Sequence, residues 1–393
     1  MLNSILGAVQ IVAVFGIVSS SLYYILCLWS AARFLREGKA RHADARIAQL
    51  SFQPPVSILK PLKGTDPEIY ESFRSHCLQD YPEYEIVFGV SDPDDPAIEF
   101  VKKLQQEFPN HRIQLMVSEK ILGANVKVSN LAQMLPLARY DHLIVNDSDI
   151  RVERDYLRRV ISPLTDPQTG MVTCLYRGVP AATLGSRLEA LGISSDFCPS
   201  VLAARQLEGG IAFGLGSTLA FRRADLEKIG GFHSFVEYLA DDYELGKRIS
   251  GLGLAVKLSD VVVETFLLPY DLADFFAHQL RWARGVRDAR AGGYLGLIFT
   301  FGFLWAFLAL AASRAALWAC GAMALVLLFR LAIALLIGRR ILSDRHVLQD
   351  VGLIPLRDLV AVGVWIVSLG GHSVTWRGER FFLKNGKLIR LSP

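Results

Sequence analysis

Charge is scarce in this sequence. Only 20% of the 393 residues are Asp, Glu, Lys or Arg, whereas 52% are hydrophobic. A soluble domain carries about a quarter charged residues, so this composition excludes intrinsic disorder, collagen and a coiled coil. The 42 basic and 38 acidic residues nearly balance at a net charge of +4, and no long basic run is present. We therefore expect no nucleic-acid partner.

Cysteine is also sparse, and its spacing carries no metal or disulfide pattern. The five cysteines form no CxxC pair and lie far apart, at Cys27, Cys77, Cys174, Cys198 and Cys320. An odd, scattered set argues against a disulfide framework and against a cysteine zinc site.

The apolar residues gather at the two ends of the chain. Residues 1–32 contain no charged side chain and are long enough to span a bilayer as a helix. A signal peptide fits poorly, because there is no basic n-region and no small-residue cleavage site. Basic residues follow at once, at Arg33, Arg36, Lys39, Arg41 and Arg46. By the positive-inside rule, they place the next segment in the cytoplasm.

The C-terminal end predicts a transmembrane hairpin followed by a membrane-associated tail. Residues 294–338 form the hairpin, with its turn at Arg314, and residues 339–393 form the tail. Within that tail, the apolar stretch 359–376 is barely long enough to span, and it is followed by basic residues. Spanning and re-entrant or interfacial placements both stay open. A final β-hairpin is predicted around Asn385-Gly386.

The middle, residues 33–293, alternates short apolar strands with helical stretches, which predicts an α/β domain. Strands are predicted at 56–59, 85–90, 113–117, 142–145 and 171–175, and helices at 97–107 and 153–161. In such sheets, ligands bind beyond the carboxyl ends of the strands. The residues directly after each strand are therefore the candidates for chemistry.

Two acidic clusters occupy that position. Asp92 and Asp95 follow the strand 85–90, and Asp147-Ser148-Asp149 follows the strand 142–145. Two carboxylates so close at the end of a buried strand repel each other unless a cation lies between them. Hard divalent ions take such oxygens and leave positions for substrate phosphates, so Asp147 and Asp149 are predicted metal ligands.

A third acidic pair and a basic-aromatic motif complete the pattern. Asp241-Asp242 begins a helical segment, where Asp241 can serve as a cap. Farther on, the chain reads His278-Gln279-Leu280-Arg281-Trp282. Asp95, Asp147, Asp242 and Arg281-Trp282 match, in order, the D, D, D, (Q/R)xxRW pattern of family 2-like inverting glycosyltransferases.

Longer segments resemble ceramide glucosyltransferases, that is, glycosyltransferase family 21: 56–64, 81–85, 94–98, 127–131 and 241–243. The bacterial glycosyltransferases associated with hopanoid biosynthesis share this pattern, and the similarity covers nearly the whole chain. It implies a GT-A nucleotide-diphospho-sugar transferase fold, a Rossmann-like mixed sheet, with transmembrane helices at both ends. It also implies a catalytic domain facing the cytoplasm, at a bacterial-type inner membrane or at a Golgi-type membrane if the source is eukaryotic.

The resemblance further implies the reaction and its participants. The donor is a UDP-sugar carrying glucose or N-acetylglucosamine, with Mg²⁺ or Mn²⁺ held by Asp147 and Asp149 against the diphosphate. The acceptor is the hydroxyl of a membrane lipid, either ceramide or a hopanoid polyol. Asp242 is the expected general base, a role worth about 100- to 10,000-fold in rate. Its place at a helix start should favour the ionised form.

Further side chains are expected to bind the donor. Asp92 or Asp95 accepts from the uracil edge, Lys127 and Asn130 lie just before a helix, and Lys63 follows the first strand. Arg281 adds a cation at the leaving diphosphate, and Trp282 offers a flat surface or packs at the membrane interface. His278 stands where the pattern has Gln or Arg, and its imidazole can still donate to a diphosphate.

Two alternatives accompany this hypothesis. A processive polysaccharide synthase of the cellulose or hyaluronan type shares the acidic pattern, but it needs more spanning helices than the roughly four apolar segments seen here. A catalytically inactive membrane scaffold on the same fold would not need Asp147, Asp149, Asp242 and Arg281 together.

Overall fold

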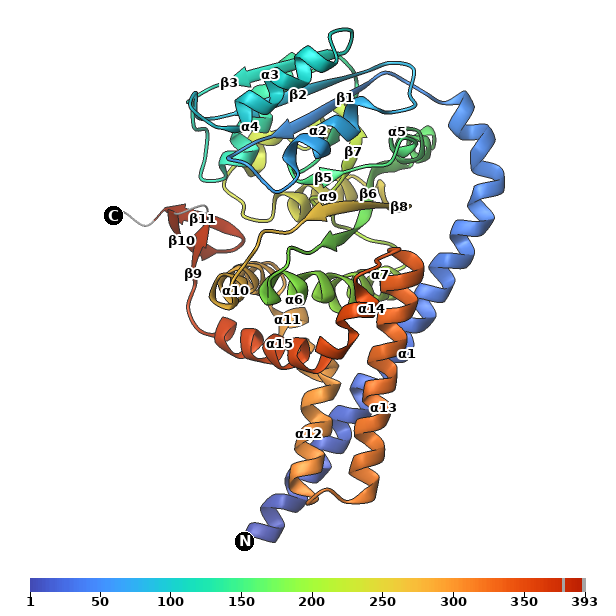
Figure 1. Ribbon diagram of the computed structural model, residues 1–393, viewed down its shortest axis with the longest axis vertical. Coiled ribbons are helices and arrows are strands. Elements are labelled where there is room, and N and C mark those ends of the chain that lie inside the picture. Colours follow the sequence, from blue (N-terminus) through green and yellow to red (C-terminus); the bar gives the residue numbers. More distant parts are fainter. Residues whose placement is uncertain (377–378, 391–393) are drawn as a thin grey trace. The chain divides into compact units, whose positions relative to one another are not determined.

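The computed structural model describes residues 1–376 and 379–390; the side chains of Leu2 and of residues 39–50, including Lys39, Arg41 and Arg46, lie outside the description. The chain forms two compact units, each assembled from several segments (Figure 1). A helical unit comprises Met1–Arg36, Pro180–Gln206 and Pro269–Asn385. A sheet unit comprises Glu37–Val179, Leu207–Leu268 and the residues from Gly386 on.

The sheet unit contains one eight-stranded mixed sheet in the order β3-β2-β1-β4-β7-β6-β8-β5. Its strands are β1 Val56–Pro61, β2 Tyr84–Val90, β3 Arg112–Val117, β4 His142–Val145, β5 Ile150–Arg151, β6 Thr169–Val179, β7 Leu219–Arg222 and β8 Ala255–Phe266. Its α-helices are α2 Ile69–Cys77, α3 Ala97–Glu107, α4 Val126–Met134, α5 Tyr156–Ile161, α8 Arg223–Lys228 and α9 Asp241–Gly251. Short 3-10 turns cover Leu135–Leu137, Ser162–Thr165 and Phe232–Phe235.

The parallel register brings the ends of three strands to one edge of the sheet. In β1, Val56 lies opposite Tyr84 of β2 and His142 of β4, and all three strands run in the same direction. Every residue of β1 is buried, as expected for a parallel strand covered on both faces. The loops after Pro61, Val90 and Val145 therefore meet at this edge.

The sheet core explains why these segments fold together. Alternate side chains such as Ile58 of β1 and Phe88 of β2 pack with Phe73 of α2, Val101 of α3 and Tyr156 of α5. Burial of such side chains contributes about 1.5–3 kcal/mol each. The five predicted strands are all present, although 171–175 is only the middle of the longer β6. The helix predicted from 153 starts at Tyr156, because Glu153 forms a turn with the Tyr156 amide.

The helical unit is built mainly from apolar helices and a short β-sheet. It contains the first part of α1 Leu2–Ser51, followed by α6 Leu184–Gly192, a π-helical turn Ile193–Phe197, α7 Cys198–Leu207, α10 Leu272–Ala289, α11 Ala291–Gly296, a 3-10 turn Leu297–Thr300, α12 Gly302–Ala312, α13 Leu317–Ile333, a π-helical segment Ala334–Ile341, α14 Val347–Asp350, a 3-10 turn Val351–Leu353 and α15 Ile354–Leu369. Its strands β9 Ser373–Trp376 and β10 Glu379–Lys384 pair in the antiparallel sense, and the following strand, β11 Lys387–Arg390, belongs to the sheet unit. Asn385 and Gly386 both adopt positive φ, so the predicted Asn-Gly hairpin is present.

Among the described residues, three helical segments are long and apolar enough to cross a membrane: Asn3–Gly38, Leu317–Ile341 and Val347–Leu369. A fourth is a bent pair, Ala291–Thr300 and Gly302–Ala312, whose axes differ by 48°. The chain turns between α12 and α13 at Arg314 and Ala315, which have φ values of 55° and 59°. The turn thus lies where the sequence places it, whereas the first limb of the hairpin is broken at Phe301.

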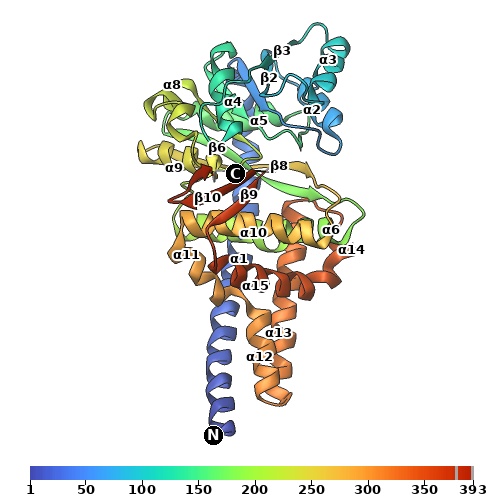
Figure 2. The same cartoon turned by 90° about the vertical axis from the view of Figure 1, so that its left-hand side faces the viewer.

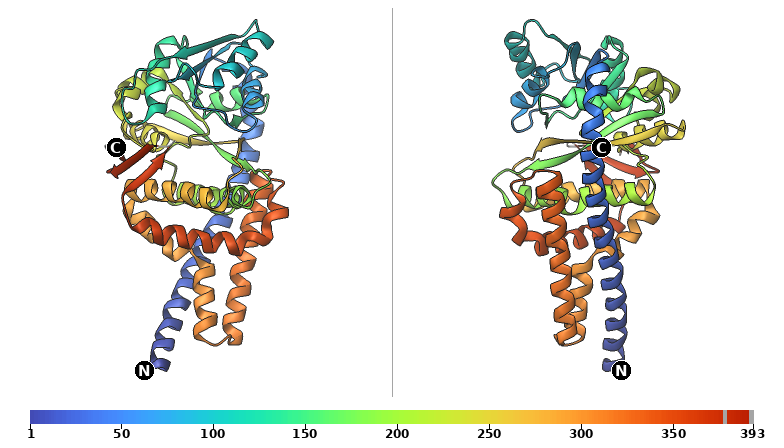
Figure 3. Two further views of the ribbon diagram at one scale, coloured as in Figure 1. Left: turned by 60° about the vertical axis from the view of Figure 1, so that its left-hand side comes forward. Right: turned by 90° about the vertical axis from the view of Figure 1, so that its right-hand side faces the viewer.

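Helix α15 differs from the other apolar helices in direction and in polarity. It runs crosswise to α12 and α13 and lies alongside α10 (Figures 1 and 3). Its buried side carries Arg357, Asp358 and Ser368. Its exposed side is apolar, with Leu356, Leu359, Ile366, Val367 and Leu369. This inside-out pattern is typical of a helix that faces lipid rather than water.

Two arginines of α10 close the C-terminal end of α15. Arg287 donates to the carbonyl of Ser368 in the last turn of α15, and Arg284 donates to that of Gly370, the residue after the helix, at 3.1 Å. Carbonyls at a helix end lack partners within the helix and carry partial negative charge, which guanidinium groups satisfy. The apolar stretch predicted through Trp376 therefore ends as a helix at Leu369, and its last residues form β9. Figure 2 shows β9 and β10 leaving this end.

Arg330, the charged interruption of α13, is satisfied inside the helical unit. Its guanidinium donates to Asp358 of α15 through two nitrogens, to Asp196 at 2.8 Å and to the carbonyl of Ser195 at 2.7 Å. A buried charge is tolerated when it is paired and hydrogen-bonded in this way. The pair joins α13 to α15.

Candidate active site

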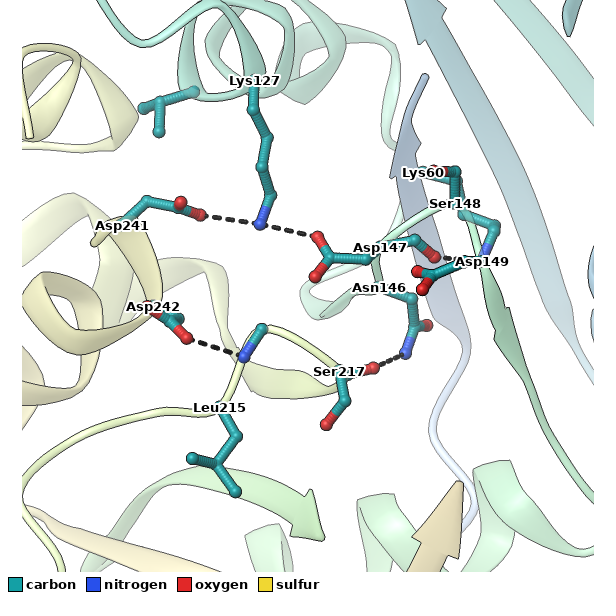
Figure 4. A network of polar contacts seen from close by, with 12 residues as sticks. Lys60, Lys127, Asn146, Asp147, Ser148, Asp149, Leu215, Ser217, Asp241 and Asp242 are labelled. Carbon is teal, nitrogen blue, oxygen red and sulfur yellow. Dashed lines mark hydrogen bonds and ion pairs between the residues drawn. The ribbon is translucent and has the colours of Figure 1, made fainter. Parts of the chain in front are cut away.

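Polar side chains converge where the three parallel strands end. Lys60, fully buried near the end of β1, donates from Nζ to the backbone carbonyl of Asp147 at 2.9 Å. Ser148 donates to the carboxylate of Asp66 at 2.5 Å. The loop after β4 is therefore fixed to the loop after β1, which positions the Asp147-Ser148-Asp149 segment (Figure 4).

Lys127 lies between two of the predicted carboxylates (Figure 4). Its ammonium is 2.7 Å from Oδ1 of Asp147 and 3.0 Å from Oδ2 of Asp241. Lys127 lies in the first turn of α4 rather than before the helix, because Asn125 is the residue that caps it, accepting from the Val128 amide. Burial acts to lower the pKa of Lys127, but the nearby carboxylates outweigh it and raise that pKa.

Asp149 has different neighbours from Asp147. Its carboxylate accepts a hydrogen bond from the Thr265 hydroxyl of β8, whereas that of Asp147 turns towards Lys127 (Figure 4). Burial, with repulsion from Asp147 and Asp66, raises the pKa of Asp149 to about 7. Burial lowers the pKa of Lys60 to about 7, while Asp149 and Asp147 act in the opposite direction. The carboxylates of Asp149 and Asp147 thus act electrostatically on Lys60 beneath the loop.

Asp242 faces the same place from the start of α9. Its Oδ2 accepts from the amide of Gly216 at 2.8 Å, and its Oδ1 accepts from its neighbour Tyr243 at 2.7 Å. Burial, and then repulsion from Asp241, raises the pKa of Asp242 to about 6, although Lys127 opposes the shift. The backbone amide of Tyr243 at the helix start does favour the ionised form, but burial and the adjacent carboxylate of Asp241 outweigh it. The expectation that Asp241 caps the helix is wrong, because Ala240 occupies the cap position of α9 and the Asp241 carboxylate pairs with Lys127.

The segment before Asp241 is held by the last strand. Within the sheet unit, Leu239 donates to the carbonyl of Gly386 at 3.0 Å, and Leu388 donates to that of Glu237 at 2.7 Å. Asn125, the cap of α4, donates from its side chain to the carbonyl of Tyr238 at 2.7 Å. These contacts connect α4, which carries Lys127, to the start of α9.

The remaining predicted donor-binding residues lie in this unit with differing exposure. Asp95 is buried, and its carboxylate accepts from the amides of Gly64 and Ala97, at 2.9 Å from each. Asp92 is exposed and accepts from the Asp94 amide. Lys63 is exposed in the loop after β1, and Asn130 is buried inside α4 with its Oδ1 unpaired. Their binding of a nucleotide stays a prediction.

The basic-aromatic motif belongs to the helical unit, on α10. His278 Nδ1 lies 3.1 Å from the carboxylate of the buried Glu189 on α6. The imidazole stacks on Tyr270, with centroids 5.3 Å apart, and also contacts Trp282 at 4.8 Å. His278 is thus fixed between two aromatic rings by a carboxylate, and Arg281 and Trp282 follow on the next turn. Arg281 belongs to the helical unit and Asp149 and Asp242 to the sheet unit, and their meeting in one site stays a prediction.

The carboxylates fit a divalent cation bound with a diphosphate. A Cβ built on Gly216 would lie 2.9 Å from Oδ2 of Asp147 and 3.5 Å from Oδ2 of Asp242. A side chain at residue 216 would therefore fill the space beside these two oxygens, which glycine leaves open. Hard oxygen donors of this kind suit Mg²⁺ or Mn²⁺. In the part of the chain that the structure describes, no three acidic, histidine or cysteine side chains gather as a complete ligand set. Part of the coordination would then come from the donor phosphates.

The family model for glycosyl transferase family 21 matches residues 12–389. The chain belongs to this family. The match covers both the sheet unit and the helical unit, and it confirms the family predicted from the acidic pattern and the flanking segments.

Curated relatives of this family 21 member are ceramide glucosyltransferases. Ceramide glucosyltransferase 3 of Caenorhabditis elegans is 24% identical over 280 residues, which is 71% of this chain and 60% of the relative. The ceramide glucosyltransferase of Candida albicans is 35% identical over 121 residues, 28% of this chain and 22% of the relative. The matched regions thus span only a part of each relative's length.

A solved structure shares the fold of this family 21 chain. The mannosyltransferase PcManGT from Pyrobaculum calidifontis, in complex with GDP-Man and Mn²⁺, superposes with a TM-score of 0.53 at 19% identity. The match covers 94% of this chain and 100% of that one. It confirms the predicted GT-A fold with its mixed sheet.

Sequence reasoning missed several residues of the site. Lys60 was not expected to contribute, although a lysine inside an otherwise apolar strand is a signal for a paired buried charge. Thr265 lies on β8, a strand that the sequence pattern did not reveal. Gly216 lies in the glycine-containing segment 214–218, where its small size permits the close approach of two carboxylates.

Proposed function

We propose that this chain is a membrane-bound inverting glycosyltransferase that transfers glucose or N-acetylglucosamine from a UDP-sugar to the hydroxyl of a membrane lipid, ceramide or a hopanoid polyol. The observation that carries the proposal is the convergence of Asp147, Asp241 and Asp242 around Lys127 and Gly216 at the strand ends. Membership of glycosyl transferase family 21 supports the same reaction.

Each carboxylate has a distinct task in this proposal. Asp242 accepts the proton of the acceptor hydroxyl as that oxygen attacks the anomeric carbon from the face opposite the leaving group. A pKa of about 6 suits this role, because the group is ionised at neutral pH and still basic. Asp147 and Asp149 hold Mg²⁺ or Mn²⁺, which when bound neutralises charge on the departing diphosphate.

Donor recognition is assigned to the loops at the same edge. Asp92 or Asp95 accepts from the uracil, and Lys63, Lys127 and Asn130 contribute donors to the nucleotide. Arg281 offers a guanidinium to the diphosphate, which it suits in geometry and charge. His278, bound to Glu189, holds Trp282 against one face of its ring.

The membrane assignment rests on the helical unit. α1, α12 and α13 are apolar and run roughly alongside one another, and α15 runs crosswise with its apolar side exposed (Figure 3). We propose that α15 lies in the plane of the bilayer rather than across it, with the sheet unit in the cytoplasm. A lipid acceptor can then present its headgroup at the interface, and no polymer channel is needed.

The test is product analysis. The purified full chain, in lipid vesicles that contain either ceramide or a hopanoid polyol, is supplied separately with labelled UDP-glucose and UDP-N-acetylglucosamine. The lipids are then identified by mass spectrometry. The proposal predicts one added hexose or N-acetylhexosamine per lipid. A ladder of polymer masses would instead indicate a polysaccharide synthase, and no product with either donor and either lipid class would indicate a scaffold.

A further inference from the structure

The Lys127 ammonium lies where a cation is required. Its side chain is only 15% exposed, and it contacts Asp147 and Asp241, which come from different parts of the chain. Asp242 adds a third negative charge close enough to influence Lys127. Without a cation these carboxylates would repel one another, since like charges in a partly buried site interact strongly.

Lys127 contacts one oxygen of the Asp147 carboxylate, and the other oxygen of that carboxylate is open to a metal ion. Oδ1 of Asp147 contacts Lys127, while Oδ2 of the same carboxylate faces the open place at Gly216 beside Oδ2 of Asp242. A divalent ion bound to Asp147 would interact with the same negative charge that Lys127 neutralises. The Lys127 ammonium and a divalent ion would therefore compete for the Asp147 carboxylate.

We propose that Lys127 is the built-in cation of the donor-free site and that a divalent ion entering with the donor displaces it from Asp147. This inference rests on the proposed function and concerns the control of metal binding at the same site. Lys127 holds the α4, α9 and β4 segments together while no donor is present. Once released from Asp147, its ammonium is free to turn to the negatively charged diphosphate, so that metal and donor bind as a unit.

The inference predicts that metal alone binds weakly to the wild type because it must break an ion pair. Lys127→Met removes the competing charge while keeping an unbranched side chain of similar length. We expect Mn²⁺, added without any nucleotide, to bind Lys127→Met about tenfold more tightly than the wild type, which corresponds to about 1.4 kcal/mol. Free Mn²⁺ is measured by its electron paramagnetic resonance signal, using the full chain in detergent.

Three further variants separate competition from general disturbance. Lys127→Arg keeps the charge, so its Mn²⁺ affinity should stay close to that of the wild type. Asp147→Asn added to Lys127→Met should abolish the gain, because it removes the contested ligand. Lys257→Met breaks the exposed ion pair of Lys257 with Asp166, 2.9 Å long, in the same unit and should leave Mn²⁺ binding unchanged.

A melting experiment covers the case in which Lys127→Met is too unstable to purify. Lys127→Gln, which keeps polar hydrogen-bonding groups, should melt below the wild type without metal and should gain more from added Mn²⁺ than the wild type does. Equal or weaker Mn²⁺ binding by Lys127→Met and Lys127→Gln overturns the inference, even if lipid glycosylation is normal. Tighter binding with no glycosylated lipid in any assay upholds the competition and counts against the proposed function alone.

Discussion

The amide of Gly216 donates to Oδ2 of Asp242 at 2.8 Å, and this contact places the carboxylate beside that of Asp147. A methyl group on Gly216 would come within 2.9 Å of Oδ2 of Asp147, closer than a carbon and an oxygen tolerate. Because residue 216 is a glycine, two carboxylates from distant segments of the chain can both approach it closely.

Gly216→Ala should therefore reduce sugar transfer by at least about tenfold while the protein stays folded, because such small displacements at a reacting centre are costly. Rates are measured with the labelled UDP-sugar, and folding is measured by the melting temperature. Gly210→Ala is the matched control, since a Cβ there meets nothing within 4 Å. Equal activity of the two variants would show that the place at Gly216 is not used.

The pH dependence of the reaction should report the pKa of Asp242. Burial and Asp241 raise this pKa to about 6, and a general base acts only when it is ionised. The value of kcat/KM should thus fall about tenfold per pH unit below 6 and level off above it. A rate that is flat between pH 5 and 8 would remove Asp242 from the role of base.

Lys60 should matter for stability as well as for the loop it holds. Lys60→Met leaves the carbonyl of Asp147 without its donor and Asp149 without its nearby positive charge. Leaving a buried carbonyl without its donor costs about 1–3 kcal/mol, so the melting temperature should drop clearly. The double variant Lys60→Met/Asp149→Asn should recover part of the loss.

The recovery is the decisive part of that experiment. A double-mutant cycle isolates the coupling between the two side chains, which is expected to be about 1 kcal/mol or more for neighbours in one polar network. Strictly additive losses would mean that Lys60 and Asp149 do not act on each other. The exposed pair Lys102–Glu99, 2.9 Å long, provides a cycle in which little coupling is expected.

The fold could be anticipated because its signals are local. The strands 56–59, 85–90 and 142–145 are apolar runs of the right length, and their parallel arrangement follows from the alternation with helices. β8 was missed because its apolar residues are interrupted by charged ones such as Lys257 and Asp260, so the sequence does not show the continuous apolar run of a buried strand. The direction of α15 also was not available from sequence, since length and hydropathy alone do not distinguish a span from an in-plane helix.

The site was anticipated in its residue types but not in its contacts. Asp147 and Asp149 were predicted as metal ligands, and their sharing of a cation stays a prediction. The contacts of Asp147 with Lys127 and of Asp149 with Thr265 were not predicted. Spacing along a chain gives the order of carboxylates, whereas their partners come from α4 and β8, which only the tertiary structure brings near. The raised pKa of Asp242 has the same origin, because burial is a property of the fold.

The most direct test compares the wild type with Asp242→Asn in one mass-spectrometric assay of the lipid product. Asparagine keeps an oxygen for the Gly216 amide and removes a charge that is costly to bury, so the variant should melt no lower than the wild type at pH 8. We predict glycosylated lipid with the wild type, none above background with Asp242→Asn, and equal UDP-sugar binding by both. Comparable amounts of glycosylated lipid from the two proteins would contradict the assignment of base-catalysed transfer to this cluster of carboxylates.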